Sequence, residues 1–144
     1  MPANVLFLCT GNSARSILAE VLLNARSIAG VTAYSAGSQP VGAVNPGAIE
    51  VLSKHGHEVA DLRSKSWDEF AGASAPSVDF VVTVCNNAAG EQCPIWNGSP
   101  MVEHWGLPDP AAVDDDAERR QAFATTYDDL LSRVDDFMTR HHLG

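Results

Sequence analysis

Short continuous apolar runs alternate along this chain with longer stretches in which apolar residues recur every three or four positions. The runs NVLFL (4–8), VTAYSAG (31–37) and VDFVVTVC (78–85) predict strands, and the first and last are apolar enough to be covered on both faces. Between the first two runs, apolar residues at helical spacing predict a helix that stops at Gly30. Buried strands that alternate with helices are typical of βαβ units, so the pattern predicts a parallel sheet.

Weaker signals complete the expected elements. Pro46 is a favourable first residue for a helix in GAIEVLSKHG, SKSWDEFAG indicates a short helix, and VEHW indicates a short strand. From about residue 117 a long helix carries its apolar side chains on one stripe, and the acidic residues among 114–118 favour its N-terminal end. Residues 86–102 are rich in Asn, Gly and Pro and predict a loop.

Length and composition place the chain among ordinary globular proteins. Its 144 residues, 45% hydrophobic and 19% charged, predict a single domain over 1–144 with a proper core. The apolar runs are far shorter than the roughly 20 residues of a membrane span. The start MPANVLFLC has neither a basic region nor an adequate apolar region, so no signal peptide is predicted and the expected location is the cytoplasm.

The net charge of −9 argues against nucleic acid or an anionic membrane as a partner, because neither would be attracted to an acidic surface. Nothing in the sequence indicates an obligate assembly, and we expect a monomer. If such an acidic protein binds an anion, the attraction must come from a local arrangement of donors.

The segment CTGNSARS (9–16) has the composition of such an arrangement. It joins the end of the first predicted strand to the following helix, which is where open parallel sheets bind ligands. Its small residues allow backbone N–H groups to turn inward together and hold a tetrahedral oxyanion at a helix N-terminus. The guanidinium of Arg15 can add bonds to two oxygens of the anion. The predicted oxyanion-binding residues are Thr10, Gly11, Asn12, Ser13, Ala14 and Arg15.

The same surroundings predict that Cys9 is a nucleophile. A thiol at a helix N-terminus beside an arginine can have its pKa lowered from about 8.5 to roughly 3.5–7.5. Ser16 is close enough in sequence for its hydroxyl to donate to the thiolate. The alternative is a buried cysteine that ends a strand, with Arg15 solvated on the helix; the strand before and the helix and serine after favour the catalytic interpretation.

The pattern C-T-G-N-S-x-R-S resembles the active-site loop of the low-molecular-weight protein tyrosine phosphatases and lacks the Gly-Lys-Ser/Thr ending of a nucleotide-binding loop. This resemblance implies a three-layer α/β fold with a central, mainly parallel four-stranded sheet flanked by helices. In that family an Asp-Pro pair supplies the general acid, and Asp109-Pro110 matches it; the alternative is an aspartate that only starts a turn. Tyrosine phosphatases usually carry an aromatic residue next, where this chain has Ala111.

Two further cysteines change this interpretation. An odd count of three without a secretory signal argues against structural disulfides. Cys85 ends the third strong strand and is expected at the same sheet edge as Cys9, while Cys93 follows in a polar loop that can bring it near Cys85. Three thiols within reach form a relay by thiol–disulfide exchange. A zinc site would need four ligands, and Cys85, Cys93 and His104 supply at most three, so no metal is expected. The other alternative is that Cys85 and Cys93 are inert buried thiols.

With these cysteines the chain resembles, more narrowly, the thioredoxin-coupled arsenate reductases built on the phosphatase fold. CTGNSARS, YSAG, VNPGAIEVL, DFVVTVC, CPIW and EHWGLPDPA carry the resemblance. It implies that Cys9 attacks arsenate held by Arg15 while Asp109 protonates the departing oxygen. Cys85 would then attack Cys9 and release arsenite, and Cys93 would attack Cys85 to present a disulfide to thioredoxin. Glutaredoxin with glutathione, or another thiol, remains open as the reductant, and no cofactor is implied.

Two other functions remain open from the sequence. One is a phosphatase whose extra cysteines protect Cys9 from oxidation. The other is an anion sensor, which would not need Asp109.

Some of these relatives bind a potassium ion behind the loop through Asn, Glu, Ser and Asp side chains. Asn12, Glu20 and Ser35 match three of them, and Lys65 stands at the fourth position. We hypothesise that the Lys65 ammonium replaces the ion; a solvent-facing lysine is the alternative. His104 is expected to be structural, and His141 to be solvated.

Overall fold

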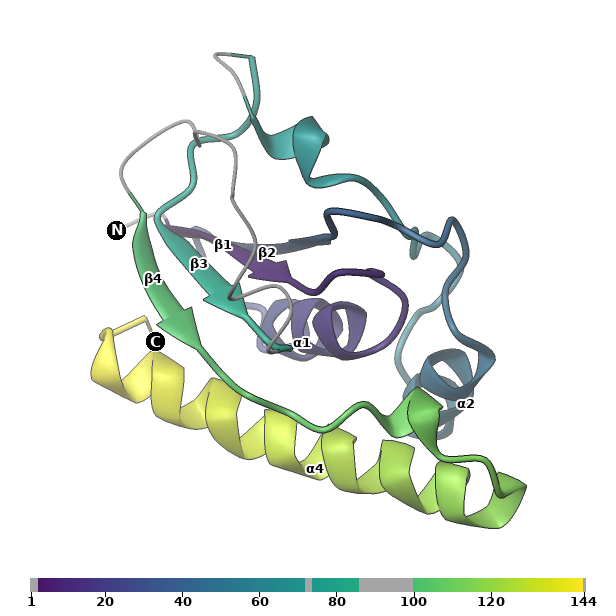
Figure 1. The fold of residues 1–144 in the computed structure, drawn as a ribbon. Helices are drawn as coiled ribbons and strands as arrows, with labels where there is room; N and C mark the ends of the chain where they lie inside the picture. Colours follow the sequence, from purple (N-terminus) through teal and green to yellow (C-terminus); the bar gives the residue numbers. More distant parts are fainter. Residues whose placement is uncertain (1–2, 72–73, 86–99, 144) are drawn as a thin grey trace.

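Four parallel strands form the central sheet of the computed structural model, which describes residues 3–71, 74–85 and 100–143. They lie in the order β2-β1-β3-β4 (Figure 1), with bounds β1 (Ala3–Leu8), β2 (Val31–Ala36), β3 (Phe80–Thr83) and β4 (Met101–His104). The predicted strands and their parallel pairing are confirmed. Because β1 is central, the loop that follows it lies in the middle of the carboxyl edge of the sheet.

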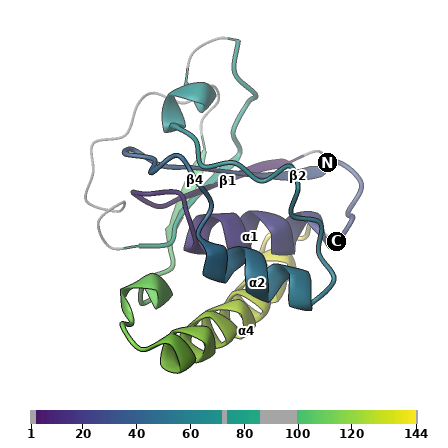
Figure 2. The same ribbon diagram turned by 90° about the vertical axis from the view of Figure 1, so that its right-hand side faces the viewer.

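Three helices pack together on one face of the sheet: α1 (Arg15–Asn24), α2 (Pro46–Lys54) and the long α4 (Asp116–Arg140) (Figure 2). On the opposite face, the described residues form the 3-10 helix η1 (Trp67–Phe70) and its adjoining loops. A second 3-10 turn, η2 (Pro110–Ala112), precedes α4. This is the three-layer α/β arrangement that we expect from the sequence. Within the described residues, no helix is long and apolar enough to cross a membrane.

The first helix ends earlier than its apolar spacing predicts, at Asn24 and not at Gly30. The side chain of Asn24 donates to the Ala33 carbonyl at 3.0 Å and accepts from the Ala33 N–H at 2.8 Å. It thereby satisfies backbone groups on the outer edge of β2, and the chain leaves the helix at this point. Gly30 instead adopts a left-handed φ of 81° where the chain turns into β2.

The predicted helix starts are confirmed. Asn45 caps α2 by accepting from the Gly47 N–H at 2.8 Å, and Pro46 is the first helical residue. Asp115 caps α4 by accepting from the Glu118 N–H at 2.9 Å. The acidic cluster before α4 therefore has the capping role that its position indicates.

The end of α4 is fastened to β4 through Glu103. Its carboxylate accepts two bonds from Arg140, both 2.9 Å, and contacts His141 Nε2 at 2.6 Å and Trp105 Nε1 at 3.0 Å. These partners, the hydrogen bond from Arg140 first, hold the pKa of Glu103 down from 4.5 to about 2. The expectation of a solvated His141 is wrong, because its ring also packs against Phe137.

Candidate active site

The β1–α1 loop turns its carbonyl groups outward. The carbonyls of Thr10, Gly11 and Ser13 accept backbone N–H groups of segment 39–45 at 3.0, 3.1 and 2.8 Å. A trans peptide is planar, so the N–H that follows each carbonyl points the opposite way. The N–H groups directed into the loop are therefore those of Gly11, Asn12 and Ala14, as an oxyanion nest requires.

Asn12 shapes the middle of this loop. It is fully buried and has a left-handed φ of 44°, which Asn tolerates better than most residues. Its Oδ1 accepts from the Lys65 N–H at 2.8 Å, and its Nδ2 donates to Ser16 Oγ at 2.8 Å. The predicted hydrogen bond from Ser16 to Cys9 is absent among the described residues, where Ser16 Oγ pairs with Asn12 instead. Ser16 thus supports the loop through Asn12.

Gly37 allows a second segment to lie directly against the loop. A Cβ at this position would lie 2.4 Å from the Thr10 carbonyl oxygen and 2.5 Å from that of Cys9. Its N–H donates to the Lys65 carbonyl at 3.0 Å, and its own carbonyl accepts from Trp67 at 2.9 Å. Only glycine fits this approach, which explains the glycine of YSAG and which the sequence interpretation missed.

Cys9 and Cys85 are brought together by the pairing of β1 with β3. Leu8 and Thr83 are register partners, and Val84 N–H donates to the Leu8 carbonyl at 2.9 Å. Both side chains are buried, and within the described residues neither cysteine is in a disulfide. A side-chain hydrogen bond links Cys85 to Cys9. The prediction that the two cysteines meet at one edge of the sheet is confirmed.

The pKa of Cys9 departs from the expectation. The hydrogen bond with Cys85 is the largest cause that raises this pKa, and burial raises it further. Arg15 and the Gly11 N–H lower it, as the sequence predicts, but these effects do not outweigh the first two. The prediction of a lowered pKa is therefore wrong, because it considered the helix and the arginine without the second thiol.

Arg15 and Asp109 face one another across the site. Arg15 Nη2 lies 3.8 Å from Asp109 Oδ2, and its Nη1 donates to the Leu107 carbonyl at 2.8 Å. Arg15 Nε is buried and has no hydrogen-bond partner within the described residues. A buried, unpaired guanidinium N–H is costly, so it is a donor suited to an oxyanion.

Asp109 serves the turn as well as the site. Its Oδ1 accepts from the Ala111 N–H at 3.0 Å and starts η2, which is the role that the turn alternative describes. Its other oxygen faces Arg15, and the side chain is 44% exposed. The carboxyl group is thus fixed through one oxygen and accessible at the other.

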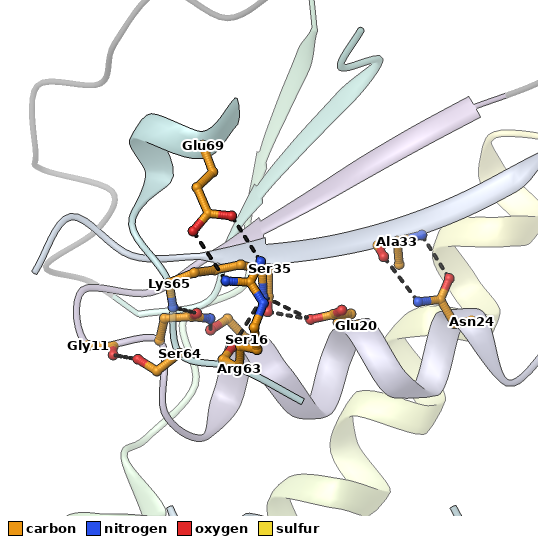
Figure 3. A network of polar contacts seen from close by, with 11 residues as sticks. Gly11, Ser16, Glu20, Asn24, Ala33, Ser35, Arg63, Ser64, Lys65 and Glu69 are labelled. Atoms are coloured by element: carbon orange, nitrogen blue, oxygen red, sulfur yellow. Dashed lines mark hydrogen bonds and ion pairs between the residues drawn. The ribbon is translucent and has the colours of Figure 1, made fainter. Parts of the chain in front are cut away.

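The ammonium group of Lys65 lies behind the β1–α1 loop. Lys65 is 8% exposed, and its Nζ lies 3.8 Å from Glu20 Oε1 and 3.2 Å from the Arg63 carbonyl (Figure 3). Ser35 donates to the same Glu20 oxygen. Burial is the largest influence on both pKa values, lowering that of Lys65 and raising that of Glu20. The solvent-facing alternative for Lys65 is wrong, because its side chain is buried and its ammonium lies beside Glu20. That this ammonium replaces a bound potassium ion stays a prediction.

Ser64 also supports the β1–α1 loop, and no pattern in the sequence indicated this role. Ser64 Oγ donates to the Gly11 carbonyl at 3.2 Å and accepts from the Gly42 N–H at 3.2 Å. It therefore links three separate segments around the nest.

Other expected site residues have varied outcomes. Cys93 lies outside the described residues. His104 is bonded through Nδ1 to Thr83 Oγ1 at 2.7 Å, in agreement with a structural role. Among the residues that the structure describes, no three His, Cys, Asp or Glu side chains are grouped to hold a metal ion.

Comparison with known proteins agrees with this geometry. The family described as low molecular weight phosphotyrosine protein phosphatase matches residues 4–143. An arsenate reductase of Shouchella clausii is 34% identical over 92% of this chain and 93% of its own length. An arsenate reductase of Bacillus subtilis is 33% identical over the same shares.

Solved structures share the fold. An arsenate reductase in the phosphate-binding state superposes with a TM-score of 0.76 and 24% identity, over 96% of this chain and 98% of that one. A thioredoxin-dependent arsenate reductase of Corynebacterium glutamicum gives a TM-score of 0.71 and 24% identity, over 99% of this chain and 63% of that one.

Proposed function

This chain belongs to the low molecular weight phosphotyrosine protein phosphatase family. We propose that it uses the loop of residues 9–16, here called the anion loop, to reduce arsenate to arsenite. The observation that carries this proposal is that two buried cysteines, Cys9 and Cys85, meet beside the nest at the carboxyl ends of the paired strands β1 and β3. Hydrolysis needs one nucleophile and water, whereas reduction of As(V) to As(III) needs two electrons. A dithiol supplies two electrons when it becomes a disulfide.

In the first step, arsenate binds to the inward N–H groups and to Arg15, including its unpaired Nε. Cys9 Sγ forms a bond to arsenic, and its thiol proton passes to an arsenate oxygen. One As–O bond breaks, and Asp109 protonates the departing oxygen so that water leaves. The raised pKa of Cys9 is compatible with this step because the bound anion is itself a base for the thiol proton.

In the second step, Cys85 attacks Cys9 Sγ. The S–As bond breaks, its electron pair stays on arsenic, and the Cys85 thiol proton passes to an oxygen of the departing arsenite as a Cys9–Cys85 disulfide forms. Cys93 then attacks Cys85, which frees Cys9 and gives a Cys85–Cys93 disulfide. An external dithiol reduces that disulfide and restores all three thiols.

We propose thioredoxin as this external dithiol and the cytoplasm as the compartment, because thiols are kept reduced there. The thioredoxin-dependent neighbour from Corynebacterium glutamicum supports this choice. Glutaredoxin with glutathione would serve the same chemistry and is the alternative reductant.

Phosphomonoester hydrolysis is the second candidate function. Cys9, Arg15 and Asp109 are sufficient for it, and the family match favours it. Ala111 stands where a phosphatase would place an aromatic ring against its substrate, so aryl phosphates should be poor substrates.

The deciding experiment mixes the protein with arsenate, thioredoxin, thioredoxin reductase and NADPH, and follows NADPH oxidation. We expect arsenate-dependent oxidation that stops in Cys9→Ser and in Cys85→Ser. Cys93→Ser should release one equivalent of arsenite per chain and then stall. Absence of NADPH oxidation together with rapid release of phosphate from a phosphomonoester, either an alkyl phosphate or p-nitrophenyl phosphate, would establish the phosphatase instead.

A further inference from the structure

A pocket of about 520 Å³ lies between α2 and α4, which run beside each other under the sheet (Figure 2). Its lining includes the apolar side chains of Pro46, Val51 and Phe123, together with Ala111 and Ala124. The helices approach closely at one end, because a Cβ on Gly47 would lie 2.4 Å from the Phe123 ring. This volume is within the range of pockets that hold small organic molecules.

The two walls carry matching side chains. On α2, Val51 and Lys54 are three residues apart, and on α4, Arg120 and Phe123 have the same spacing. Residues three apart share a helix face, so each wall presents an apolar surface beside a cation. Phe123 is 2% and Val51 is 6% exposed, and both therefore belong to the floor.

The pocket concentrates positive charge in an acidic protein. Three of the nine Lys and Arg residues line it, against two acidic residues. Arg119 and Arg120 pair with Asp116 and Glu50, whereas Lys54 forms no ion pair within the described residues. The N-terminal residues of both helices, Pro46 and Asp116, also line the pocket and add the positive ends of their dipoles.

We propose that this pocket binds a small organic anion with an apolar or aromatic body. The anionic group would pair with Lys54 and Arg120, and the body would lie against Pro46, Ala111 and Ala124, over the floor that Val51 and Phe123 form. None of the anion-loop residues 9–16 lines this pocket, and Ala111 is the lining residue that adjoins Asp109. The proposal does not depend on the proposed function of the loop.

The test uses 8-anilinonaphthalene-1-sulfonate, an aromatic sulfonate whose fluorescence rises on binding. We expect saturable binding of one molecule per chain, with amide shifts confined to residues such as Gly47, Ala111 and Ala124. Saturating phosphate, which we expect the anion loop to bind, should not displace the probe.

Two variants and one control complete the test. Lys54→Glu should lower the affinity for the probe about tenfold, because it reverses the charge at this position. Ala124→Trp should abolish binding of the probe, because the larger side chain fills the pocket. Arg133→Glu removes a cation from α4 outside the pocket and should leave binding unchanged. Thermal melts establish that each variant is folded; if Ala124→Trp does not fold, the surface variant Lys54→Glu carries the test. No saturable binding, displacement by phosphate, or equal affinity in Lys54→Glu would overturn the proposal.

Discussion

The thiol of Cys85 is the hydrogen-bond partner of the Cys9 thiol, and this contact is the largest cause that raises the pKa of Cys9. The two residues are far apart in the sequence and meet because β1 and β3 are adjacent parallel strands. The proximity of Cys85 raises the pKa of Cys9, and it also places the Cys85 thiol where it can attack Cys9.

Cys85→Ala should lower the pKa of Cys9, because its largest raising influence is removed while Arg15 and the Gly11 N–H remain. We expect alkylation of Cys9 by iodoacetamide to become about tenfold faster at neutral pH. Mass spectrometry of labelled peptides over a pH series measures this, with Cys85→Ser as the matched variant that keeps a hydrogen-bonding group. An unchanged or slower rate in Cys85→Ala would contradict the assignment.

Gly37→Ala should distort the anion loop, because its Cβ would enter the space of the Cys9 and Thr10 carbonyl oxygens. We expect a loss of about 1–3 kcal/mol in the free energy of unfolding and a marked loss of phosphate affinity. Denaturant unfolding and calorimetry provide the measurements. Gly11→Ala is the control for stability, because its Cβ would meet Val41 at 3.5 Å and Ser13 Oγ at 3.9 Å, which are ordinary contacts. Equal stability of the two variants would show that the close approach at Gly37 is unimportant.

Wild-type activity should be the same in sodium and potassium buffers, because the Lys65 ammonium already lies beside Glu20. Lys65→Met should lower the free energy of unfolding by about 3 kcal/mol, since it leaves a largely buried carboxylate without its cation. The double variant Glu20→Gln/Lys65→Met removes both charges and should recover part of that loss. Strong activation of the wild type by potassium would refute the internal cation.

Arg119 should act as a positioning residue for Asp109. Its Nη1 donates to the carbonyls of Val113 and Asp114 at 3.1 and 3.0 Å, and so it holds the far end of the loop that carries the acid. Arg119→Lys loses this paired geometry, and we expect kcat to fall about tenfold with little change in phosphate affinity. Arg133→Lys on the same helix is the control. A change confined to KM or to stability would exclude this role.

Glu103 should stabilise the fold in neutral solution and lose that effect in acid. Its pKa is lowered from 4.5 to about 2, so its contribution is complete above pH 4.5 and disappears as the pH falls towards 2. Glu103→Gln should cost about 1–3 kcal/mol at neutral pH and flatten the acid limb of the stability profile. Unfolding monitored over this pH range tests the expectation, with the exposed Glu58→Gln as the comparison. Parallel profiles for wild type and Glu103→Gln would contradict it.

The sequence alone determined the features that depend on neighbouring residues. Apolar runs and helical spacing predicted the strands and most helix starts, because these patterns follow from the local period of each element. The small residues before Arg15 predicted the inward amide groups, since they leave room for successive backbone N–H groups to turn toward one point at a helix N-terminus. The meeting of Cys9 with Cys85 also followed, because carboxyl ends of adjacent parallel strands share one edge.

Only the tertiary structure decided the properties that depend on residues distant in the chain. It reversed the expected pKa of Cys9, since burial and the second thiol act only after β1 and β3 pair. It buried Lys65 beside Glu20, because the segment after α2 packs behind the anion loop. It also requires glycine at position 37, because the end of β2 lies directly against the carbonyl groups of Cys9 and Thr10. Local sequence patterns do not show which distant side chains are buried together. Burial beside one another sets the pKa, and therefore the charge and reactivity, of side chains such as Cys9 and Lys65.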